Sequence, residues 1–208
     1  MKKIILTVFV LALMVSGKSF AQIEINAFTG WVPASKTAYS YNGYRLRIAG
    51  SQNFGIGIGM NTPVGLVEFS YMGFSSTLTQ DGGIQYLDPQ PINVNYYMLG
   101  ILKTLMEHEK LVPYGMFNIG VSNFNVTEES YNPVRFSIGL GLGLRYFFTP
   151  AIGIRLQARL LMPLYFGGIG FGCGVGTNGS SCGGGAYFGV EIFQGVFTGG
   201  VVIKINNQ

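Results

Sequence analysis

The stretch FSIGLGLGLRYFF, residues 136–148, places a large apolar side chain at every second position and mostly glycine or arginine between them. A period of two is typical of a β-strand, because successive side chains point to opposite faces of a sheet. The glycines from Gly139 to Gly143 also resemble part of a dinucleotide-binding fingerprint. That fingerprint requires a glycine turn followed by a helix, whereas here the alternation continues to Phe147. We therefore interpret these glycines as positions on the small-residue face of a strand.

The same alternation recurs along the chain and predicts eight strands. The second ends at Met60, and its alternation holds back to Tyr44; the last ends near Ile205. The other six cover residues 22–31, 64–79, 92–105, 111–126, 134–148 and 151–166. Short turns alternate with longer loops at 32–43, 80–91, 127–133 and 167–187. In an up-and-down sheet all short turns then lie at one end, which is the layout of an outer-membrane barrel.

Alternation alone fits a membrane barrel and also a secreted soluble barrel. Charged residues are only 11% of the chain, against about 25% in ordinary soluble proteins. The apolar faces of strands 134–148 and 151–166 carry no charge over a length that can span a membrane, about 9–11 residues. Their other faces are rich in small residues, which suit the narrow lumen of an eight-stranded barrel. Aromatic residues near strand ends predict interfacial girdles: Trp31, Tyr96, Tyr97, Phe147, Phe148, Tyr165 and Phe166.

The N-terminus has the pattern of a secretory signal peptide. Two lysines precede an apolar run at residues 4–15, and Ser19-Phe20-Ala21 offers small residues for cleavage after Ala21. The run is too short for a spanning helix, which needs about 20 residues. Residues 1–21 are therefore predicted to be removed, leaving 22–208 as a single barrel domain. Three of the 13 basic residues lie in the signal peptide, so the mature chain has 10 basic and nine acidic residues. This nearly neutral charge gives no reason to expect a nucleic-acid partner.

These features resemble the small outer-membrane β-barrel proteins of Gram-negative bacteria, the group that includes outer-membrane protein A-like and porin-family barrels. The resemblance rests on the alternating segments 53–59, 112–120 and 136–155. It implies an all-β fold, an eight-stranded antiparallel up-and-down transmembrane β-barrel, in a monomer of the outer membrane with surface-exposed loops. One departure is the C-terminus, because the chain ends in Asn206-Asn207-Gln208 and not in an aromatic residue.

The sequence offers no constellation suited to catalysis, and we expect no enzymatic activity, cofactor or metal. The single histidine, His108, lies between Glu107 and Glu109 in a short turn, where three adjacent side chains cannot converge on one ion. A lipid-modifying enzyme would need a serine, a histidine and an acid at the loop end. The predicted role is structural or interactive, through loops that meet membrane lipid, lipopolysaccharide and envelope or surface proteins. A narrow pore for small solutes is the alternative, and a lipid-modifying enzyme is a more remote one.

Two groups of residues carry specific hypotheses. Cys173 and Cys182 are the only cysteines, and export to an oxidising compartment predicts a disulfide between them. A charge cluster is predicted in the periplasmic half of the lumen, where charges must pair because an unpaired buried charge costs several kcal/mol. Its predicted members share the polar face and a similar height: Glu24, Glu68, Lys103, Arg145 and Arg155.

Overall fold

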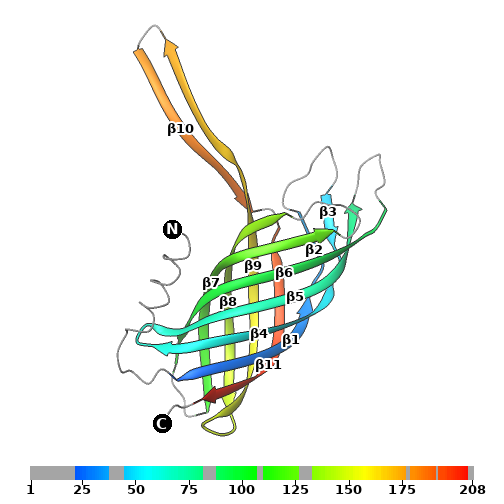
Figure 1. The fold of residues 1–208 in the computed structure, drawn as a ribbon, viewed down its shortest axis with the longest axis vertical. Coiled ribbons are helices and arrows are strands. Elements are labelled where there is room, and N and C mark those ends of the chain that lie inside the picture. Colours follow the sequence, from blue (N-terminus) through cyan, green and yellow to red (C-terminus); the bar gives the residue numbers. More distant parts are fainter. Residues whose placement is uncertain are drawn as a thin grey trace, which may run out of the picture.

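The protein forms a closed antiparallel β-barrel (Figure 1). The computed structural model describes residues 22–37, 45–81, 88–106, 110–126, 133–176, 179–190 and 192–205, without the side chains of residues 81 and 165–189. The barrel strands are β1 (Ile23–Val32), β4 (Ser51–Thr62), β5 (Gly65–Asp81), β6 (Gln90–Thr104), β7 (Leu111–Val126), β8 (Val134–Phe147), β9 (Ile152–Gly176) and β11 (Gln194–Ile205). Each pairs with the next in this order, and β11 pairs with β1 to close the ring. The eight-stranded prediction is confirmed.

The two ends of the barrel differ. The short connections between β4 and β5, between β6 and β7, and between β8 and β9 lie at one end, together with the start of β1 and the end of β11. We call this the turn side and the opposite end the loop side. The loop side carries β2 (Ser35–Lys36), β3 (Arg45–Ile48) and β10 (Gly179–Val190). In the described ranges, no helix has the length and apolar character needed to cross a membrane.

The alternation read from the sequence sorts side chains between the outside and the lumen. On β4, Phe54, Ile56 and Ile58 are 56–63% exposed on the outer surface. On the neighbouring β1, Glu24 and Asn26 are buried in the lumen. Strand geometry explains this sorting, because a residue and its second neighbour point to the same face.

The alternation that reaches from Met60 back toward Tyr44 does not form one unbroken strand, because β3 ends at Ile48 and β4 begins at Ser51. β3 and β4 both pair with β5, but Ile48 lies opposite Leu78 and Asn53 lies opposite Phe74, so the register shifts by one residue between them. Such a one-residue shift, as at a β-bulge, reverses the faces of the residues beyond it. Ile48 is therefore buried, although its sequence parity is that of the exposed Phe54.

The expected loop at 167–187 is a β-hairpin. β9 continues to Gly176 and pairs with β10, and the two strands project well beyond the loop side of the barrel (Figure 1). The sequence contains the signal for this extension, because Ile169, Phe171, Cys173 and Val175 alternate with glycines. Clustered glycines usually indicate a loop, but apolar residues at every second position indicate a strand.

The hairpin backbone places Cys173 directly opposite Cys182. Directly opposite residues in an antiparallel pair have Cα atoms about 4.5–5.5 Å apart, and disulfides bridge Cα atoms about 4.4–6.8 Å apart. Both side chains lie outside the described residues, so the disulfide stays a prediction. We expect mass mapping of non-reduced peptides to find a Cys173–Cys182 link. Two alkylated thiols in protein purified without reductant would contradict it.

An apolar layer fills the middle and loop side of the lumen. Its largest contributor is β6, on which Val94, Tyr96 and Met98 are at most 1% exposed. The layer consists of Phe28, Val32, Ile48, Met72, Phe74, Ile92, Val94, Tyr96, Met98, Phe124, Leu161, Ile192 and Val196. The predicted small-residue lumen is therefore correct only in part. Tyr96 and Phe147, which were expected in the interfacial girdles, are buried, because each lies on the inward face of its strand.

Candidate functional site

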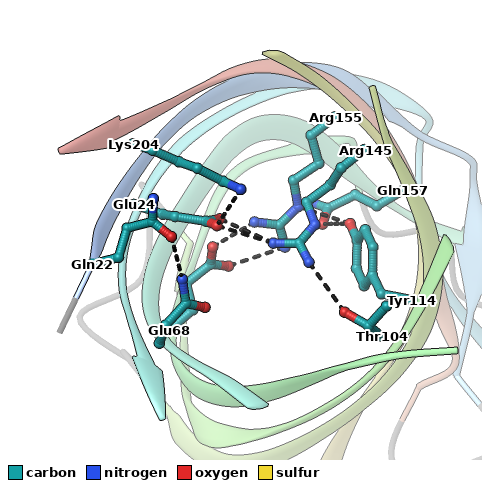
Figure 2. A network of polar contacts seen from close by, with 10 residues as sticks. Gln22, Glu24, Glu68, Thr104, Tyr114, Arg145, Arg155, Gln157 and Lys204 are labelled. Atoms are coloured by element: carbon teal, nitrogen blue, oxygen red, sulfur yellow. Dashed lines mark hydrogen bonds and ion pairs between the residues drawn. The ribbon is translucent and has the colours of Figure 1, made fainter. Parts of the chain in front are cut away.

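Charged side chains from opposite walls meet in the turn-side part of the lumen (Figure 2). Glu24 on β1 and Glu68 on β5 both lie opposite Gly59 of β4, so the carboxylates share one row of the barrel. Arg145 on β8 lies directly opposite Arg155 on β9. The two acids on one wall therefore face two arginines on the other, and the positive charges of the arginines compensate the negative charges of the acids.

Glu24 is held by Arg145. Nη1 of Arg145 donates to both carboxylate oxygens of Glu24, at 3.2 and 3.1 Å, and both residues are buried. Arg145 Nη2 also donates to Thr104 Oγ1 at 3.5 Å. Lys204 Nζ lies 3.8 Å from Glu24 Oε1 and 3.7 Å from the centroid of the Phe147 ring. Glu24 thus has two cationic neighbours, one of them fully inside the lumen.

Glu68 and Arg155 form a two-pronged ion pair. Arg155 Nη1 donates to Glu68 Oε2, and Nη2 donates to Oε1 at 3.2 Å. The third donor, Nε, reaches the Tyr114 hydroxyl at 2.7 Å, and this hydroxyl donates to Gln157 Oε1 at 3.2 Å. Glu68 is 3% exposed and Arg155 1%. Buried pairs of this kind need further hydrogen bonds to offset desolvation, and here each nitrogen of the guanidinium donates at least one.

Tyr114 connects the two ion pairs. Its ring centroid lies 5.4 Å from Cζ of Arg145 and 5.1 Å from Cζ of Arg155, distances at which an aromatic face attracts a guanidinium. The ring packs over Gly143 of β8, where an added Cβ would overlap the ring and lie 2.7 Å from the Leu156 carbonyl oxygen. Gly143 therefore makes room for the tyrosine.

The structure brings four of the five predicted cluster residues together and places Lys103 elsewhere. Lys103 is exposed on the outer face of β6, next to Leu102, which is buried in the lumen. Sequence parity was misleading on this strand, because Lys103 shares its face with Asn93 and Asn95, whereas the inward face is the apolar one. Near the turn-side end, a long lysine chain can reach the membrane surface from an outward position.

Four other members of the network were missed from the sequence: Thr104, Tyr114, Gln157 and Lys204. Strand parity carried a signal for three of them. Tyr114 shares the inward face of Asn118, Gln157 shares that of Arg155, and Lys204 follows the inward Val202 by two residues. We did not expect an aromatic ring or a neutral amide to take part in a charge network.

The turn residues Glu107, His108 and Glu109, which were not expected to form a metal or catalytic site, lie outside the described ranges. Among the residues that are described, no three histidine, cysteine, aspartate or glutamate side chains are grouped to hold a metal ion.

The fold defines an outer-membrane β-barrel of the small, eight-stranded class. The chain matches the family model described as outer membrane protein beta-barrel domain over residues 7–188, and it belongs to this family. Family membership places the protein in the outer membrane of a Gram-negative bacterium. No curated protein matched the chain.

Several solved structures share the fold. The outer membrane protein OprG from Pseudomonas aeruginosa is 11% identical with a TM-score of 0.55, over 92% of this chain and 99% of that one. Neisserial surface protein A is 12% identical with a TM-score of 0.52, over 91% and 100%. The outer membrane protein AlkL is 11% identical with a TM-score of 0.52, over 92% and 94%. At such low identity these likenesses concern the fold alone.

Proposed function

We propose that the protein is a non-enzymatic outer-membrane barrel with a closed lumen that acts in the envelope through its loop-side surface. The observation that carries this proposal is the filling of the lumen by two successive layers. The turn side holds the ion-pair network, and the middle and loop side hold the apolar layer. A pore for hydrated solutes needs a continuous polar path, and the apolar layer interrupts it.

The apolar layer is supported by a hydrogen bond across the lumen and by a ring contact between neighbouring strands. The Tyr96 hydroxyl donates to Gln194 Oε1 at 2.6 Å, which joins β6 to β11 across the lumen. The Tyr96 ring also meets the Phe124 ring edge-on, with centroids 6.4 Å apart. Contacts of this kind favour a rigid plug over a mobile constriction.

The loop-side rim offers a surface for interaction. Lys36 lies opposite Arg47 in the β2–β3 ladder, and Arg45 is two residues away on the same face as Arg47. All three are exposed, and Arg45 and Arg47 lie on the face opposite the buried Ile48. Cations at this height face the outer leaflet, where the phosphates of lipopolysaccharide lie, so lipopolysaccharide is the first partner that we propose. The projecting β9–β10 hairpin provides a second surface, for envelope or surface proteins.

The closed lumen predicts an absence of conductance. In planar bilayers we expect the purified protein to show no steady single-channel steps, because the apolar layer excludes hydrated ions. A heat-modifiable gel shift would confirm that the protein in the same preparation is folded, and a porin in the same bilayers would show that the assay detects a pore. Reproducible conductance steps from folded protein would contradict the closed lumen and favour the narrow-pore alternative.

A further inference from the structure

The buried charges of the lumen do not balance. Among the described residues, the charged side chains classed as buried are Glu24, Glu68, Arg145, Arg155 and Arg159. Glu24 forms an ion pair with Arg145, and Glu68 forms one with Arg155. Arg159 on β9 is 4% exposed and has no carboxylate within ion-pair distance in the described part of the chain.

The contacts of Arg159 do not satisfy its donors. Nη2 lies 3.6 Å from Met72 Sδ, and Cζ lies 5.1 Å from the centroid of the Phe28 ring. Nε is buried without a hydrogen-bond partner. A thioether is a weak acceptor, whereas a guanidinium carries five N–H donors. A buried charge left in this state costs several kcal/mol, so an additional acceptor is expected.

Neutral polar groups around Arg159 also lack partners. Asn118 Nδ2 has none and lies 3.3 Å from the Cβ position of Gly139, while Cγ of Arg159 lies 3.0 Å from the Cβ position of the adjacent inward glycine, Gly141. The Thr198 hydroxyl has none and lies opposite Gln157, two residues from Arg159 on β9. Both polar atoms of the Asn26 amide are likewise unpaired, two residues before Phe28 on β1. Unpaired polar atoms, among them the donors Nε of Arg159 and Nδ2 of Asn118, thus lie on inward positions near this cation.

We propose that Arg159 marks an internal binding site for one small inorganic anion, such as chloride, between the ion-pair network and the apolar layer. A monovalent anion would neutralise the guanidinium and accept hydrogen bonds from its Nε and from the nearby amide and hydroxyl groups. The ligand must be small, because the apolar layer and the ion pairs fill the lumen on both sides. This site is independent of the loop-side role.

Stability in different anions tests the site. Urea unfolding of the protein in phospholipid vesicles would be followed at constant ionic strength while chloride replaces gluconate, which is too large for the lumen. We expect the unfolding midpoint to rise with chloride, because a ligand that binds only the folded state stabilises it by mass action. Arg159→Met should abolish this rise, Arg159→Lys should retain part of it, and the exposed control Lys103→Met should leave it intact.

A direct location uses wild-type protein only and does not depend on whether a variant folds. Crystals grown with sodium bromide should give an anomalous peak within hydrogen-bonding distance of the Arg159 guanidinium. The inference is overturned by a site that holds only water in the bromide crystals. It is equally overturned by a wild-type midpoint that ignores chloride, or by the same chloride response in wild type and Arg159→Met.

Discussion

Replacing Glu68 with alanine is expected to destabilise the barrel by about 3–5 kcal/mol, because it leaves the charge of Arg155 buried and uncompensated. Arg155→Ala should cost a similar amount, since it strands the carboxylate instead. In the double variant neither charge remains, so its loss should be smaller than the sum of the single losses by about 0.5–3 kcal/mol. Urea unfolding in phospholipid vesicles measures all three free energies.

Lys103→Ala provides the matched control for this pair. It also removes a charge from the turn-side half of the barrel, but from the exposed outer face, so its effect should stay within about 0.5 kcal/mol. Strictly additive losses for Glu68→Ala and Arg155→Ala would show that water solvates the two charges separately. That result would also weaken the closed-lumen proposal.

Replacing Tyr114 with alanine is expected to cost about 3–5 kcal/mol, the usual range for removing a buried aromatic ring. The ring is completely buried and lies against both guanidinium groups of the network. Tyr114→Phe should cost less, about 1–3 kcal/mol, because it removes only the hydroxyl that satisfies Arg155 Nε.

The comparison of these two variants separates packing from hydrogen bonding. Equal losses for Tyr114→Phe and Tyr114→Ala would mean that the hydroxyl alone matters. Losses below 1 kcal/mol in both would contradict the bridging role that we assign to Tyr114. Gly143→Ala gives an independent check, because its Cβ would collide with the same ring and should destabilise the barrel without removing any polar group.

The sequence was most informative where one face of a strand differs clearly from the other. On β8, glycines and Arg145 alternate with leucines, and the structure places them on the predicted faces. On β6 the inward face is apolar and the outward face includes Asn93 and Asn95, so the expected faces of Tyr96 and Lys103 were reversed. A pattern assigns a face only through contrast, and an apolar layer in the lumen can reverse that contrast.

Some errors had a signal that composition concealed. The alternation from Ile169 to Val175 was present, but abundant glycine made the segment resemble a loop. The register shift between Ile48 and Asn53 had no comparable signal. A one-residue shift of register depends on how both strands pair with β5, and local sequence does not encode the partner.

The sequence by itself determined the fold class, the number of barrel strands, the two unlike ends and the presence of charges on inward faces. Each of these follows from local periodicity, because strand geometry fixes the face of every second residue. Only the tertiary structure decided which charges meet. Glu68 and Arg155 are 87 positions apart, and they pair because ring closure sets β5 opposite β9 at one height. The isolation of Arg159 was decided in the same way, since a missing partner is a property of the closed barrel and not of any one strand.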